Sequence, residues 1–130
     1  MIEDIAQYID DNSLGTWADT GGTIFTSFQP ASPDNCITIL DTAGTEPNEI
    51  SGLHFPTFQV IVRNTDYQTG RALFESIKTL LHSTKNMTIG NTYFYYILLI
   101  TEGGHIGDDG NGRDEIGRDE WSCNFRCQTR

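Results

Sequence analysis

The chain has 130 residues, a length that predicts one domain able to bury a core without a structural metal or disulfide. Eighteen acidic residues against eight basic ones give a formal net charge of −10. This balance argues against a nucleic-acid-binding surface, because such surfaces neutralise phosphates with Lys and Arg. It leaves open that DNA passes nearby without binding, and equally that the acids only keep the protein soluble.

Three cysteines are present, Cys36, Cys123 and Cys127, and the N-terminus lacks the basic and apolar regions of a signal peptide. We therefore expect a cytoplasmic product with free, mostly buried thiols. A Cys123–Cys127 disulfide is not expected, because four residues of strand span about 13 Å and a disulfide needs Cα atoms within about 7 Å. The longest apolar run, residues 93–100, is shorter than the roughly 20 residues of a membrane helix.

Two segments have the periodicity of amphipathic helices. Near the start, Ile2, Ile5, Ala6 and Ile9 follow the spacing i, i+3, i+4, i+7. The clearer helix is residues 66–82. Its apolar stripe comprises Leu73, Phe74, Ile77, Leu80 and Leu81, extended one turn back by Tyr67. Its residues expected to face water are Arg71, Glu75, Lys78 and His82.

Several segments have the composition of strands. Residues 23–28 and 36–41 are expected to pair as a hairpin through the turn that contains Pro30 and Pro33. Residues 42–54 form a polar stretch longer than a typical connection, so we expect a loop that projects from the sheet.

Residues 58–63 alternate in polarity and predict a strand before the main helix. Gly90 and Asn91 predict a two-residue hairpin turn. Its second arm, at 93–100, is apolar on both faces, as in a central strand or a strand covered by another subunit. Residues 121–127 alternate cleanly and predict a half-buried strand.

The predicted order is therefore helix, three strands, helix, a β-hairpin and a last strand within a single domain of residues 1–130. This order indicates an α+β fold, with a twisted, mostly antiparallel or mixed β-sheet that carries both helices on one face.

No set of residues indicates catalysis or a cofactor, so we expect neither. The histidines His54, His82 and His105 lie on different elements, with no carboxylate or Cys at metal-ligand spacing. Residues 107–119 hold closely spaced Asp and Gly and match a calcium-binding loop weakly. The alternative interpretation is an acidic, solvated loop between two strands. A structural or interaction role fits better than an enzyme.

The chain resembles the minor capsid or tail terminator proteins of long-tailed phages, and the resemblance covers residues 4–126. The segments that carry it are DIAQYIDDNSLGT, FQPASPDNCITILDTAG, FPTFQVIVRNTDYQTG, TIGNTYFYYILLITEGG and GRDEWSCNF. The blocks DNCITI and PTFQVIVR carry most of the weight. These motifs are structural and are specific in combination.

The resemblance implies an α+β virion protein at the head–tail junction, made in the host cytoplasm. Such proteins form a hexameric ring that caps the tail tube, ends its polymerisation and meets the head connector, while DNA passes through the channel. The implied partners are further copies of the chain, the tail tube protein and the head connector or completion protein, without a membrane. An acidic channel lining would repel phosphate and let DNA slide.

A closed ring needs two different contact patches on each subunit. The residues expected to form subunit or partner contacts are Glu46, Glu49, Arg63, Tyr93, Tyr95, Asp108, Asp109 and Arg113. Three alternatives remain open: a head-completion or connector-stopper protein, a monomeric calcium-dependent binding module that uses residues 107–119, and a small enzyme with an unrecognised site.

Overall fold

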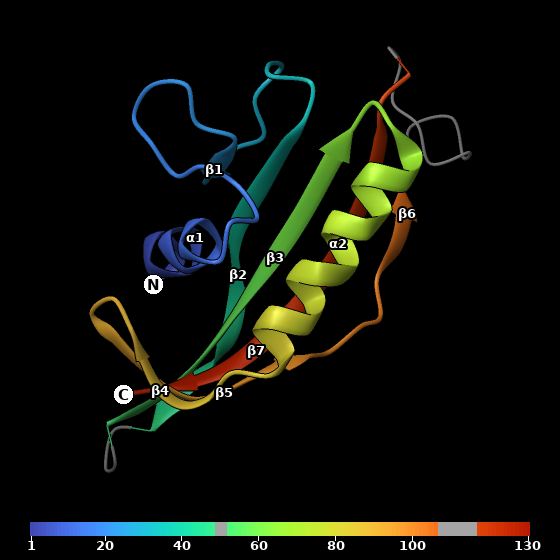
Figure 1. Ribbon diagram of the computed structural model, residues 1–130. Helices are drawn as coiled ribbons and strands as arrows, with labels where there is room; N and C mark the ends of the chain where they lie inside the picture. Colours follow the sequence, from blue (N-terminus) through green and yellow to red (C-terminus); the bar gives the residue numbers. More distant parts are fainter. Residues whose placement is uncertain (49–51, 107–116) are drawn as a thin grey trace.

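The computed structural model describes residues 1–48, 52–106 and 117–130. The described residues form two helices and seven strands (Figure 1). In chain order these are α1 (Ile2–Asp11), β1 (Ile24–Thr26), β2 (Cys36–Asn48), β3 (Leu53–Asn64), α2 (Tyr67–His82), β4 (Lys85–Ile89), β5 (Thr92–Leu99), β6 (Gly104–Ile106) and β7 (Asp119–Thr129). The predicted order of elements is confirmed, with the short strand β6 added.

The strands form one mixed sheet in the order β1-β2-β3-β7-β5-β4, and β6 pairs with β7 where β5 has ended. Every pairing is antiparallel except that of β1 with β2, which is parallel. The α+β prediction is therefore confirmed, but the predicted hairpin between residues 23–28 and 36–41 is wrong. Because β1 is only three residues long, segment 27–35 is long enough to bring the chain back to the end of the sheet where β1 begins. Strand β2 can therefore run parallel to β1.

The expectation of a loop over residues 42–54 is also wrong. Strands β2 and β3 continue through most of it, with register shifts at Thr45 that accommodate the irregular sequence. Beyond Ile39 none of the described strands pairs with the other side of β2, so Pro47 lies in an edge strand, where proline is tolerated. At Gly44 a Cβ atom would lie 2.9 Å from the Cα of Pro56, so only glycine fits there.

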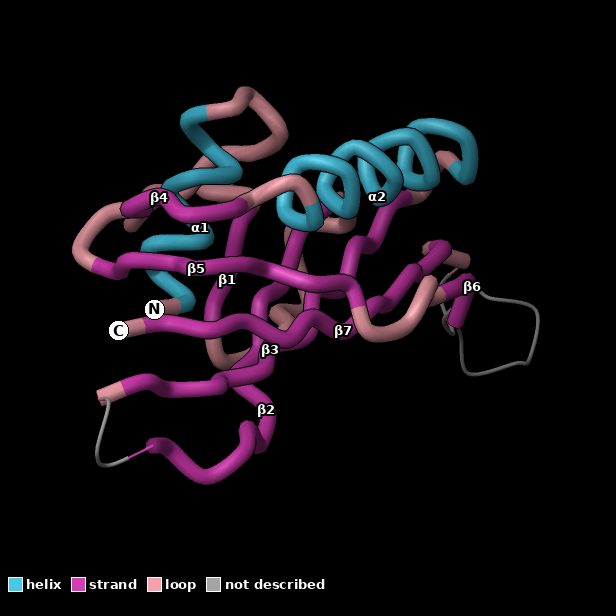
Figure 2. The backbone as a smooth tube through the Cα atoms, turned by 90° about the horizontal axis from the view of Figure 1, so that it is seen from below, coloured by secondary structure: helices cyan, strands magenta, loops and turns pink. Residues whose placement is uncertain are grey.

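Both helices lie on the same face of the sheet, as predicted (Figure 1). Helix α2 packs across β3, β7 and β5, and Figure 2 shows it on one side of these strands. Helix α1 contacts β1 and β2 near one end of the strand order and β4 at the other. The sheet is therefore curled around α1, which lies between β1 and β4 in Figure 1.

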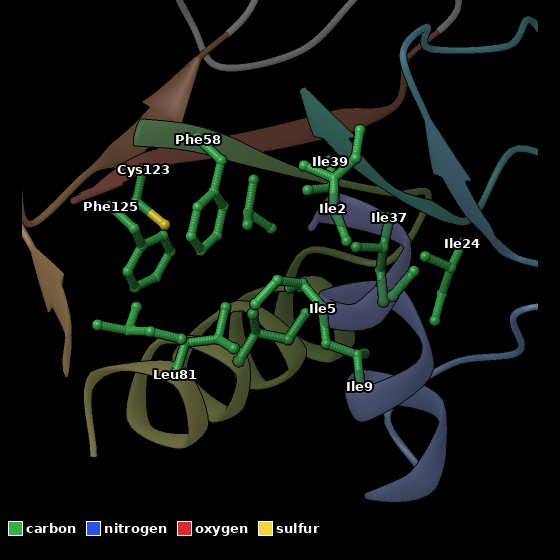
Figure 3. Packing of buried hydrophobic residues seen from close by; sticks show 14 of the residues in the cluster. Ile2, Ile5, Ile9, Ile24, Ile37, Ile39, Phe58, Leu81, Cys123 and Phe125 are labelled. Carbon is green, nitrogen blue, oxygen red and sulfur yellow. The ribbon is translucent and has the colours of Figure 1, made fainter. Parts of the chain in front are cut away.

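The core fills the inside of this curl. Ile5 and Ile9 of α1 are fully buried and point into the cluster formed by the strands and α2 (Figure 3). The rings of Phe58 and Phe125 stack with their centroids 5.1 Å apart. Each fully buried side chain of this size contributes about 1.5–3 kcal/mol of transfer free energy.

On α2 the predicted stripe is confirmed at Phe74, Ile77 and Leu81, which are all buried. The expectation that Lys78 faces water is wrong, since only 9% of the residue is exposed. Its stem lies against the sheet, and its ammonium group lies 5.1 Å from the ring centroid of Phe74. The same group pairs with Glu75 at 3.4 Å and with Glu102 at 3.3 Å, which satisfies its charge at the surface.

Gly70 is the one glycine within α2, and the indole ring of Trp121 leaves no room for a side chain at this position. A Cβ atom at position 70 would lie 2.7 Å from Cη2 of Trp121 and 2.8 Å from Cβ of Asn64. The indole is itself buried, so it cannot move aside freely. The glycine thus weakens the isolated helix but lets it approach β7 closely.

All three cysteines are buried and free, as the sequence predicts. Burial raises the pKa of Cys123 and of Cys127 from 9.0 to about 12. Burial also raises the pKa of Cys36, against a smaller opposing effect of the Arg63 charge.

In Gly70→Ala we expect overpacking to cost about 1–3 kcal/mol, against the roughly 1 kcal/mol by which alanine favours a helix over glycine. The free energy of unfolding should therefore fall by up to about 2 kcal/mol. Urea unfolding followed by circular dichroism measures the change. The matched control is Ser76→Ala, at an exposed position of the same helix, which should stay within about 0.5 kcal/mol of the parent. A stabilised Gly70→Ala protein would contradict the packing described.

The thiols of Cys123 and Cys127 should resist iodoacetamide at pH 8 in the folded protein, because the thiolate is the reactive form. Both should react within minutes in 8 M urea, where their pKa returns to its ordinary value. Peptide mass spectrometry measures labelling at each position. Rapid labelling of Cys123 without denaturant would show that the centre of the sheet opens readily.

Candidate functional site

The sheet face opposite the helices carries a row of polar side chains. Alternation along β7 separates its two faces cleanly: Trp121, Cys123, Phe125 and Cys127 are buried, and the residues between them are at least partly exposed. The exposed set is Glu120, Ser122, Asn124, Arg126 and Gln128. We call this side the outer face of the sheet.

One end of the outer face is closed by the chain itself. The guanidinium group of Arg63, on β3, donates to the backbone carbonyl of Pro33 at 2.6 Å and to that of Asp34 at 3.1 Å. Arg118 donates to the carbonyl of Ala31 at 2.6 Å and lies 3.4 Å from the Asp34 carboxylate. Segment 27–35 is therefore held across β2 and β3 by two arginines.

The other end of the outer face remains open, and β5 dominates it. The register shifts between Phe94 and Tyr96, so that β5 has one more residue than β7 in this interval. This bulge leaves Tyr95 and Tyr96 half-buried in succession, while Phe94 and Ile97 on either side are fully buried. The rings of Tyr93 and Tyr95 meet edge to face, with centroids 5.0 Å apart.

Basic residues lie beside these tyrosines. Lys85 on β4 is opposite Tyr96, and Arg126 on β7 is opposite Leu98. Both basic residues are exposed, and neither forms an ion pair with any residue that the structure describes. The tyrosine patch, as we name it, comprises Lys85, Tyr93, Tyr95, Tyr96, Leu98, Arg126 and Gln128.

The composition of the tyrosine patch is that of a protein-binding surface. Tyrosine and arginine are enriched at interfaces and in the residues that dominate binding energy. Tyrosine offers a large apolar ring together with a hydroxyl group that can hydrogen-bond to water or to the partner at the hydrated edge of an interface. The unpaired basic charges favour a partner that is acidic where it makes contact.

The structure places the contact residues predicted from the sequence in three settings. Tyr93 and Tyr95 come together on the open part of the outer face. Arg63 is only 3% exposed and is used within the chain, so it offers no free surface in this conformation. Glu46 lies in β2, but its side chain is outside the described part of the structure, as are Glu49, Asp108, Asp109 and Arg113.

Sequence reasoning pointed to the region of Tyr93 to Tyr96 but missed Arg126 and Lys85. The alternation around Arg126 was visible and places it on the polar face of the last strand. Its closeness to the tyrosines depends on β5 pairing with β7, which no local pattern encodes. The bulge that exposes Tyr96 is likewise a property of the pairing.

His105 contacts a carboxylate from another strand. Its Nε2 atom lies 2.9 Å from Oδ1 of the buried Asp119. The imidazole also stacks on the Trp121 ring, with centroids 5.0 Å apart. These contacts hold β6 against β7.

No cluster of three or more metal-ligating side chains occurs among the residues whose positions are described. The proposed calcium-binding loop, residues 107–119, falls mostly outside them, with only 117–119 described. Within the described chain, neither helix is long and apolar enough to cross a membrane.

Comparison with protein families identifies one match. The model of the bacteriophage tail terminator protein family covers residues 8–130, which is nearly the whole chain. No curated protein matches the chain significantly. The family is one of structural virion proteins, in agreement with the resemblance noted from the sequence. The chain therefore belongs to the bacteriophage tail terminator family.

Proposed function

We propose that this protein forms a closed ring, six subunits in the family it resembles, at the head-proximal end of the phage tail. There the ring caps the last layer of tail tube protein, stops its polymerisation and presents a surface to the head connector or completion protein. Membership of the tail terminator family supports the location in the virion. The tyrosine patch is the observation that carries the proposal, because its half-buried tyrosines and exposed basic residues have the composition of a protein-binding surface.

A ring also accounts for the shape of the fold. Closure requires each subunit to contact its two neighbours through different surfaces. The curled sheet supplies two such surfaces, since α1 and α2 occupy one face and the tyrosine patch the other.

The charge of the chain suits the passage of DNA through such a ring. With 18 acidic and 8 basic residues, a subunit repels phosphate more than it attracts it. DNA is expected to pass through the channel without specific binding, because the counterion release that drives phosphate binding needs clustered cations.

Adding the protein to polymerising tail tube protein should shorten the tubes as its concentration rises, and each shortened tube should end in a ring. Negative-stain electron microscopy measures tube length and end structure, and light scattering measures the mass of the free protein. Bovine serum albumin at equal concentration is the control for crowding. Tubes of unchanged length with bare ends would contradict the proposed function.

The free protein should not retard double-stranded DNA in a gel at 150 mM salt, even at 10 µM protein. At 50 mM salt, where phosphate contacts are stronger, retardation should still be absent, because the net repulsion is then stronger too. Salt-dependent binding tighter than 1 µM would contradict the role assigned to the acidic charge.

A further inference from the structure

The structure points to the partner of the tyrosine patch. We propose that the patch of one subunit docks on the outward side of α1 in the next copy of the chain, an inference that rests on the ring proposed above. The surface on α1 is a stripe of three residues, Glu3, Gln7 and Asp11, which we call the acidic stripe.

The acidic stripe is displayed by the same packing that buries α1. Its three residues are spaced by four, so they lie along one side of the helix. All three are exposed, while the opposite side, with Ile5 and Ile9, is fully buried. The side-chain amide of Gln7 donates to Oδ1 of Asp11 at 2.9 Å, which aligns two members of the stripe.

Charge is divided unequally along the chain. Residues 1–62 contain nine acidic residues and no Lys or Arg, so neither of these side chains comes from α1, β1, β2 or the part of β3 before Arg63. At the tyrosine patch the situation is reversed, with Lys85 and Arg126 unpaired among the described residues. The two surfaces are therefore electrostatically complementary, which guides both encounter and register.

The position of the two surfaces selects a head-to-tail contact. Helix α1 covers the inside of the curled sheet and the tyrosine patch lies on its outer face, so one subunit cannot bring them together. A two-fold dimer through the patch would place Lys85 and Arg126 against their own copies, and like charges would repel. A heterologous contact pairs opposite charges at every junction, and it forms a ring when the rotation between neighbouring subunits closes.

The chemistry of the contact follows from the side chains. The tyrosine rings supply apolar area, and their hydroxyl groups can donate to the carboxylates of Glu3 and Asp11. Lys85 and Arg126 can pair with the same carboxylates at the rim, where charges contribute more to specificity than to affinity.

Charge reversal on each surface separately tests this contact. Lys85→Glu with Arg126→Glu makes the patch acidic, and Glu3→Lys with Asp11→Lys makes the stripe basic. Each double variant alone should need at least tenfold more protein than the parent to form rings, measured by sedimentation velocity with tail tube protein present and absent. An equimolar mixture of the two should recover rings, because every junction between unlike variants again joins opposite charges.

The matched control is Arg71→Glu, a charge reversal at an exposed position of α2 outside both surfaces, which should assemble like the parent. Thermal unfolding of each variant checks that it is folded. Independently, carbodiimide should couple Lys85 to Asp11 between subunits in a mixture of ¹⁴N- and ¹⁵N-labelled parent protein.

The outcomes separate this inference from the proposed function. If the parent forms rings and both double variants still do so at parental concentrations, the contact proposed is wrong and the ring stands. If the variants fail alone and their mixture also fails, the pairing of these two surfaces is wrong. If the parent forms no ring with or without tail tube protein, the proposed function and the contact both fall.

Discussion

The insertion of α1 into the curl of the sheet is the interaction on which the rest of the structure depends. Without α1, helix α2 would cover only part of the apolar face of the sheet. The two ends of the strand order would then lack the helix that contacts both. Ile5 and Ile9 are fully buried where α1 meets β1 and β2 on one side and β4 on the other. Because one short helix contacts both ends of the strand order, its apolar stripe fixes the curvature of the sheet and defines which face is outside.

That single arrangement sets the chemistry of both surfaces. With the apolar side of α1 turned inward, Glu3 and Asp11 face solvent, whereas Asp4 and Asp10 are partly buried and accept hydrogen bonds from Thr92 and from the backbone of Trp17. The strict alternation of β7 places aromatic and thiol groups inside and polar groups outside. The bulge in β5 then adds Tyr96 to the outer face beside Tyr95, at a cost of one irregular pair in the ladder. Arg63 closes the far end by holding segment 27–35, so the open surface is confined to one end of the sheet.

The parts of the fold that sequence reasoning predicted are those determined by local periodicity. Both helices, the Gly90–Asn91 hairpin and the last strand were found because a side-chain period of 3.6 or 2 reports directly on one buried face. The parallel pairing of β1, the extension of β2 and β3 through a Gly- and Pro-containing stretch, and the burial of Lys78 were missed, since each depends on a neighbour distant in sequence. At the candidate site, Tyr93 and Tyr95 stood out in an apolar run, whereas Arg126 joins them only through sheet register.

The proposed ring would bring strongly acidic chains together, and the charge distribution offers a way to offset their repulsion. Copies that each carry a formal charge of −10 repel one another at a distance, and physiological salt screens this repulsion only beyond about 8 Å. Association therefore needs local attraction that exceeds it at contact. Lys85 and Arg126 form no ion pair with a described residue of the subunit, so under the proposal two of the eight basic side chains are available for that attraction. The same arrangement keeps most of the cations away from the acidic half of the chain, so a surface that attracts a neighbouring subunit need not also attract DNA.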